Sequence, residues 1–215
     1  MTRLMLVLWV AAACASDRAP APNSDKAPSS DKVTPMANGF DKARASFRAH
    51  VARSLGIRDD QLNVGPPTQD SADQMREKVG AAWAFVSGVK GDPSRGRNGW
   101  ATADGTVITT QQNLGVLLDQ AGVWAGSADV FKIADSIVWS LGDGYSVHDD
   151  PIAGGVNPEI TSQNGAGKIE FTVGYRQAGP GGAGGGPVFT SRATITFTAD
   201  KQATLHRTPH PAELR

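Results

Sequence analysis

The chain contains a single cysteine, no net charge and no long apolar segment, and each absence excludes a class of protein. Because Cys14 is the only cysteine among 215 residues, no disulfide can form within the chain, and no cysteine nucleophile can act in the rest of it. Lys and Arg total 21, and Asp and Glu also total 21, so the chain has no net positive charge that would attract nucleic acid. The apolar run Leu4–Ala13 is shorter than the roughly 20 residues of a membrane-spanning helix.

Motifs for nucleophilic catalysis and for nucleotide binding are also missing. No serine stands in a G-x-S-x-G pattern. Residues 179–184 match G-x-G-x-x-G, but Pro187 and the β-rich run Val188–Thr198 follow where a dinucleotide site needs a helix. No P-loop lysine follows either. We therefore interpret the glycine-rich stretch Gly179–Gly186 as a hairpin loop and predict no cofactor.

Two histidines near the C-terminus have a spacing that zinc sites use on helices. His206 and His210 are four residues apart, but Pro209 and Pro211 are incompatible with a helix there. We expect this end of the chain, residues 209–215, to be a flexible tail.

One acidic loop and one helical histidine are the remaining candidates for a site. Asp143, His148, Asp149 and Asp150 crowd one loop and could together hold a cation. The run lacks the alternating acids and the terminal glutamate of a calcium loop, so a solvated loop is favoured and we predict no metal site. His50 lies beside apolar helix positions, where a histidine at the boundary of the core is the usual case.

What is present begins with a secretory pattern at the N-terminus. Arg3 supplies a positive charge, Leu4–Ala13 an apolar stretch, and small residues surround Cys14. This order is typical of a secretory signal peptide.

The end of this segment, Ala11-Ala12-Ala13-Cys14, resembles the lipobox of bacterial lipoproteins, although Ala11 stands where these signals usually carry leucine. The resemblance covers only about the first 14 residues. It implies that residues 1–13 are a signal peptide, and that Cys14 carries the lipid, such as palmitate, and becomes the mature N-terminus. Ala15 in place of aspartate would direct the protein to the outer membrane of the cell envelope. Ordinary secretion into the periplasm, with cleavage after Ala13 or Ala15, is the alternative.

Residues 14–39 read as a lipid-anchored tether. Its four prolines lie among Ala, Ser, Asp and Lys without apolar periodicity, so the segment cannot bury enough surface to order itself. We expect the globular domain to cover residues 40–208.

Within that domain the apolar periodicity predicts three helices and several strands. One helix presents Phe40, Phe47, Val51 and Leu55 and ends at Gly56, and two more cover Gln111–Gln120 and Asp129–Leu141. Residues 72–80 favour helix or coil, and Asp143–Gly167 is interpreted as a loop. The predicted strands are Gln61–Val64, Ala82–Val89, Trp100–Ala103, Thr106–Thr109, Ile169–Arg176, Val188–Thr198 and Ala203–His206.

These elements predict an α+β fold with an antiparallel sheet and helices on one face. Thr102-Ala103-Asp104 recurs as Thr198-Ala199-Asp200, each time between two strands and downstream of a helix. A duplicated helix-plus-β-meander unit is therefore a second hypothesis.

The functional interpretation is a cell-envelope lipoprotein with a non-catalytic role in binding, assembly or inhibition. Its expected partners are the membrane, through the lipid, and an envelope protein; no nucleic acid is expected. An envelope hydrolase with scattered site residues and a purely structural lipoprotein are the alternatives.

Overall fold

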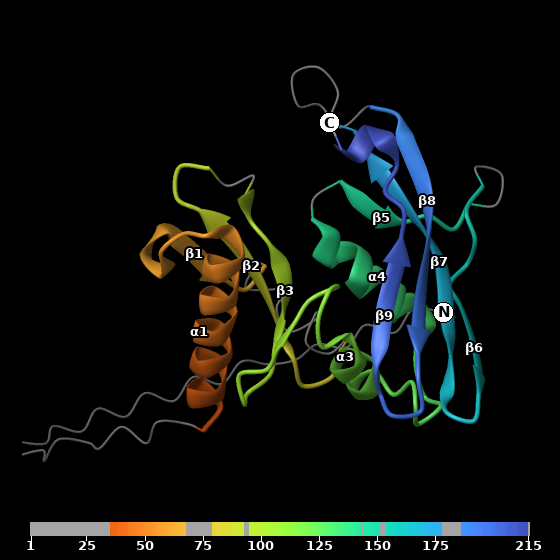
Figure 1. Ribbon diagram of the computed structural model, residues 1–215, viewed down its shortest axis with the longest axis horizontal. Coiled ribbons are helices and arrows are strands. Elements are labelled where there is room, and N and C mark those ends of the chain that lie inside the picture. Colours follow the sequence, from red (N-terminus) through yellow and green to blue (C-terminus); the bar gives the residue numbers. More distant parts are fainter. Residues whose placement is uncertain are drawn as a thin grey trace, which may run out of the picture. The chain divides into compact units, whose positions relative to one another are not determined.

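The computed structural model describes residues 35–67, 79–92, 95–142, 144–150, 154–177 and 186–214, all within the unit Val33–Arg215, with side chains from Gly39 onward (Figure 1). This part of the chain contains three α-helices and two antiparallel sheets, which confirms the α+β class.

Helix α1 (Pro35–Leu55) packs on one face of the first sheet, and Phe47 and Val51 are buried there as predicted. Gly56 adopts a φ of +65°, the left-handed conformation that ends a helix, and the N–H of Ile57 donates to Ala52 O at 3.0 Å. The helix begins before Phe40, so the predicted boundary between tether and domain was about five residues late.

The first sheet has the order β1-β2-β3-β4, in which each strand pairs with the next one along the chain. Its strands are β1 (Leu62–Gly65), β2 (Trp83–Val89), β3 (Asn98–Ala101) and β4 (Val107–Ile108). Successive side chains alternate between two cores: Phe85 lies in the core beneath α1, whereas Ala84 and Trp100 lie in the core on the opposite face. This sheet is therefore covered by helices on both faces.

Two helices connect the sheets and fill the space between them. They are α3 (Leu114–Gln120) and α4 (Val130–Leu141). The N-cap Asp129 accepts a hydrogen bond from the N–H of Lys132 at 3.1 Å, and this bond lowers the pKa of the Asp129 carboxyl. Buried α4 residues such as Ile133 and Ile137 share one core with Trp100 of β3 and Phe171 of the second sheet.

The second sheet has the order β5-β7-β8-β9, with β6 also paired to β7. Its strands are β5 (Tyr145–Val147), β6 (Glu159–Gln163), β7 (Ala166–Arg176), β8 (Val188–Phe197) and β9 (Ala203–Arg207). Strands β5 and β6 pair with different halves of β7, so together they serve as one interrupted edge strand. The interpretation of Asp143–Gly167 as a loop was wrong, because pairing with β7 orders two short strands there, β5 and β6.

The two sheets are reached by a similar order of elements, although the duplication itself stays a hypothesis. In each case a helical segment precedes a meander of four paired strands, with β6 as the addition in the second. The last turns of the two meanders match closely. The N–H of Thr102 donates to Thr106 O, and the N–H of Thr198 donates to Gln202 O, both at 3.0 Å. The Thr102 hydroxyl donates to Asp104, and the Thr198 hydroxyl donates to Asp200. Gly105 and Lys201 then take positive φ values of 92° and 64°.

The C-terminal residues up to Leu214 are part of the folded unit. Pro211–Leu214 form a short 3-10 helix, and the Glu213 side chain is only 2% exposed where it pairs with Arg207. The prediction of a flexible tail over residues 209–215 was therefore wrong for the described residues 209–214. Prolines exclude an α-helix there, but they permit this single tight turn.

Candidate functional site

A polar pocket of about 250 Å³ lies between α1, the start of β3, the turn after β4 and the end of α4. The side chains that surround it are Phe47, His50, Val51, Ser54, Arg97, Asn98, Thr109, Thr110, Gln111 and Ser140. At about 30 Å³ for each water-sized group, this volume takes a small molecule of fewer than about ten such groups.

Three segments hold the polar walls of the pocket in place. The Asn98 amide donates to Trp139 O at 3.1 Å and so ties β3 to the last turn of α4. A tight turn follows β4, in which Thr109 and Gln112 bond each other through their backbones and the N–H of Gln111 donates to Thr109 Oγ1 at 3.2 Å. The turn is pinned by Asn113, whose amide donates to Val107 O at 2.7 Å.

His50 is held in a defined state at the wall formed by α1. Its Nδ1 lies 3.3 Å from the amide nitrogen of Gln112, and because that nitrogen is a donor, Nδ1 accepts and Nε2 carries the ring hydrogen. Burial of the ring, and then the charge of Arg53, lower the pKa of His50. Both causes favour the neutral form of the imidazole.

The charge balance of the pocket favours an anion or a neutral polar ligand. Arg97 supplies a cation, held by its Nη1 hydrogen bond to Gly96 O at 2.9 Å, and none of the described residues around the pocket is an aspartate or glutamate. An anion would also favour the protonated form of His50 and so gain a second positive group.

The two serine hydroxyls at the pocket, those of Ser54 and Ser140, are not arranged as nucleophiles. Ser54 donates to Val51 O at 2.9 Å, and Ser140 donates to Ile137 O at 2.6 Å. Each hydroxyl hydrogen is thus engaged by the backbone of its own helix, and no Ser–His pair is formed.

Apart from His50, the residues singled out from the sequence as site candidates lie outside the pocket. Cys14, Asp143 and most of the stretch Gly179–Gly186 are outside the described residues. His148 is half-buried and packs against Gly174: a Cβ added to Gly174 would lie 3.3 Å from the Cβ of His148. Asp149 and Asp150 are exposed. Within the described ranges, no group of three His, Cys, Asp or Glu side chains could hold a metal ion.

The two C-terminal histidines take different partners. His206 lies on β9, with its Nε2 3.4 Å from the Thr196 hydroxyl. His210 stacks on Phe189 with ring centroids 4.5 Å apart, and its Nδ1 accepts from the N–H of Ala212 at 3.1 Å. Both roles are structural.

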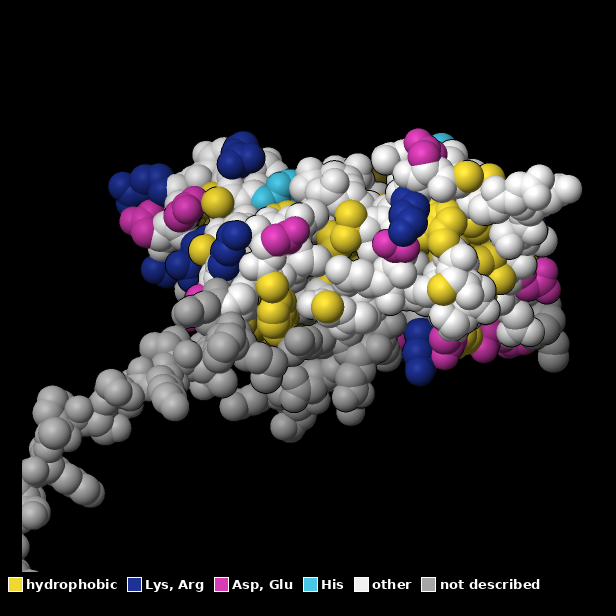
Figure 2. All heavy atoms as spheres, turned by 90° about the horizontal axis from the view of Figure 1, so that it is seen from below, with side chains coloured by type: hydrophobic (Ala, Val, Ile, Leu, Met, Phe, Trp, Pro, Cys, Tyr) yellow, Lys and Arg dark blue, Asp and Glu magenta, His cyan; other side chains and the backbone are white. Residues whose placement is uncertain are grey.

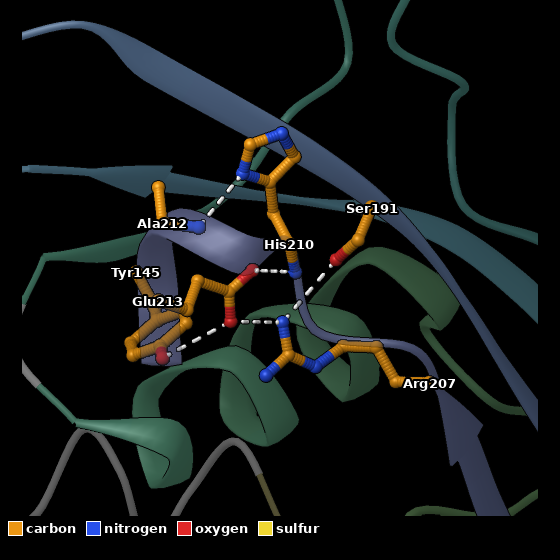
Figure 3. A network of polar contacts seen from close by, with 6 residues as sticks. All are labelled: Tyr145, Ser191, Arg207, His210, Ala212 and Glu213. Carbon is orange, nitrogen blue, oxygen red and sulfur yellow. Dashed lines mark hydrogen bonds and ion pairs between the residues drawn. The ribbon is translucent and has the colours of Figure 1, made fainter. Parts of the chain in front are cut away.

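A buried polar network, which sequence reasoning missed, holds the C-terminus on the second sheet (Figure 3). Glu213 accepts hydrogen bonds from Arg207 at 2.6 Å, from the Tyr145 hydroxyl at 3.2 Å and from the N–H of His210 at 2.9 Å. Arg207 also donates to Ser191 at 3.2 Å and lies over the Tyr145 ring. Burial, and then the Glu213 charge, raise the pKa of Tyr145.

The pocket residues were not found from the sequence because they come from four separate segments. Only His50 was noted, as a histidine at the core boundary, and the structure confirms that placement.

None of the helices in the described part of the chain has the length and apolarity to cross a membrane. Neither a family model, nor a curated protein, nor a solved structure matches this chain.

Proposed function

We propose that this protein is a cell-envelope lipoprotein, anchored through Cys14, that binds a small carboxylate-bearing molecule without catalysis. The observation that carries the binding role is the pocket that combines Arg97, the neutral His50, and amide and hydroxyl groups, with no carboxylate among its described residues. A guanidinium is the side chain best matched to a carboxylate, because its parallel N–H groups bond both oxygens. The lipid anchor, the outer-membrane location and an envelope partner rest on the sequence around Cys14.

The binding role is tested with a panel of small carboxylates and neutral analogues of the same shape. Thermal melts and isothermal titration should show binding of a carboxylate but not of its neutral amide. Arg97→Gln should weaken that binding about tenfold or more, because it removes a charge-assisted hydrogen bond. Arg95→Gln is the matched control, since Arg95 is exposed and does not line the pocket. Equal affinities in both variants would contradict the assignment.

The anchor is tested separately by fractionation. The Cys14→Ser variant should leave the membrane fraction and appear in the soluble fraction of the envelope. If it still sediments with membranes after a high-salt wash, Cys14 is not the anchor.

A further inference from the structure

A second candidate site lies on α1, away from the His50 pocket, where two hollows meet at Arg44 and Arg48. The larger hollow has a volume of about 520 Å³ and lies against β1 and β2, between residues 63–65 and 86–88. The smaller one, of about 340 Å³, is bounded by Asp41, Arg44, Ala45 and Arg48. The two hollows share no residue with the His50 pocket.

Arg44 is held in position while part of its guanidinium stays free. Its Nε donates to Val64 O at 2.7 Å, which fixes the group beside β1. Within the described residues, Arg44 makes no ion pair, and its two terminal nitrogens have no hydrogen-bond acceptor. Those nitrogens remain available for an external acceptor.

Arg48 also lines both hollows and is not neutralised by a described carboxylate. Its Nε is buried, yet it has no hydrogen-bond partner in the described part of the protein. A buried donor without an acceptor is unfavourable, and native proteins satisfy nearly all such groups. Arg48 also makes no ion pair with any described carboxylate, Asp41 included.

The two arginines are spaced to act together. Residues i and i+4 of a helix lie on one face with Cβ atoms about 5–6 Å apart, so both guanidinium groups reach the same hollow. On the opposite wall, a Cβ built on Gly65 would meet nothing within 4 Å, so the space in front of the β1 backbone is open.

The surrounding charge adds to this effect. Although the whole chain has no net charge, the described side chains of α1 include Lys42, Arg44, Arg48 and Arg53 against the single acid Asp41. In Figure 2, Lys and Arg side chains gather over the end of the molecule formed by α1 and β1, with a few acids among them. A local positive potential there attracts anions.

We propose that Arg44 and Arg48 form a phosphate-binding site, independent of the carboxylate pocket. Two guanidinium groups offer several N–H donors in planar forks, which match the tetrahedral arrangement of phosphate oxygens. The phosphate could be carried by a lipid headgroup or be free in solution, and the test separates these two sources.

The test uses the full chain with Cys14→Ser, so that a lipid cannot itself bring the protein to vesicles. Inorganic phosphate should raise the melting temperature relative to chloride at equal ionic strength, and the same dissociation constant should appear in a titration. Arg44→Gln and Arg48→Gln should each weaken phosphate binding about tenfold or more. Arg53→Gln is the control, because it removes one charge from the same helix but lines neither hollow.

A vesicle arm identifies the source of the phosphate. If vesicles of phosphatidylcholine with phosphatidylglycerol retain the protein, and inorganic phosphate releases it, the site binds a headgroup. If phosphate binds and the vesicles do not retain the protein, the site binds a soluble phosphate. No response to phosphate, or an equal loss in Arg53→Gln, would overturn the proposal. Should Arg48→Gln fail to fold, Arg48→Lys keeps the charge but removes the planar fork, and it must show the same weakening.

Discussion

At the scale of single residues, the pair between Arg207 and Glu213 is the most buried of the ion pairs between described residues. Their side chains are only 10% and 2% exposed, so water screens the interaction very little. Tyr145, Ser191 and the backbone of His210 supply further hydrogen bonds, which a buried ion pair needs to offset its loss of hydration. This arrangement holds the last turn of the chain on the second sheet.

Glu213→Gln should lower the free energy of unfolding by about 3–5 kcal/mol, because it leaves the Arg207 charge buried without a partner. Urea unfolding followed by circular dichroism measures this change. The double variant Arg207→Met with Glu213→Leu should lose less than Glu213→Gln, since no lone charge remains. A loss below about 1 kcal/mol for Glu213→Gln would show that the pair is effectively solvated.

The second residue prediction concerns the pH dependence that His50 introduces. The pKa of His50 in the folded protein lies below the ordinary value of 6.5. As the pH falls through 6.5, the unfolded chain therefore binds more protons than the folded protein does. The contribution of His50 to the free energy of unfolding is therefore fully present above pH 6.5. It decreases as the pH falls toward the pKa of His50 in the folded protein. The measurement is an NMR titration of the His50 ring, together with melting temperatures between about pH 7.5 and 5.5.

His50→Gln should reduce this loss of stability at acid pH. A carboxylate bound in the pocket should move the His50 titration to higher pH, because the anion favours the protonated ring. A folded midpoint at or above 6.5 would contradict the assigned environment.

At the scale of elements, the fold depends on one close approach between α3 and the turn that joins β8 to β9. A Cβ on Gly115 would lie 1.9 Å from Lys201 O, a separation that no packing tolerates. Lys201 also pairs with Asp119 of α3 at 2.9 Å. The helix can therefore sit on the turn only where residue 115 has no side chain.

Gly115→Ala should destabilise the protein by about 1–3 kcal/mol, even though alanine favours a helix by about 1 kcal/mol. Val116→Ala is the matched control on the same helix, because Val116 is 37% exposed; its effect should stay within about 0.5 kcal/mol. Chemical unfolding of the two variants compares them directly. Equal stabilities would mean that the helix shifts freely away from the turn.

At the scale of the whole described unit, the two sheets share a core, so they should unfold together. Ile108 of the first sheet, Ile137 of α4 and Phe171 of the second sheet belong to one cluster of buried side chains. Neither sheet can bury these surfaces without the other. Cooperative unfolding follows from this common core.

Ile108→Ala should lower the free energy of unfolding by about 2–5 kcal/mol in a single transition. Although Ile108 lies in the first sheet, amide exchange should show that β7 and β8 of the second sheet lose protection by the same amount. Protection lost only in the first sheet, or two separate transitions, would show that the two sheets fold independently.

Several elements could be predicted from the sequence because their signals are local. The spacing of Phe47 and Val51 and the stop at Gly56 each depend on neighbours within a few residues. The repeated Thr-Ala-Asp motif was informative for the same reason, since its hydrogen bonds close within five residues. The Cys14 motif is local too, and it stays a prediction because it lies outside the described residues.

Other features were decided by the tertiary structure alone. Strand β6 has one apolar residue, Ile160, and becomes a strand because β7 pairs with it. The candidate sites join segments far apart in the chain, as where Asn98 meets α4 or Arg44 meets β1. Periodicity reports which face of an element is apolar, but it does not report which polar groups from distant elements meet. By itself, the sequence determined the elements with strong local signals. Long-range pairing and the burial of charge decided the edge strand formed by β5 and β6, the C-terminal turn and both candidate sites.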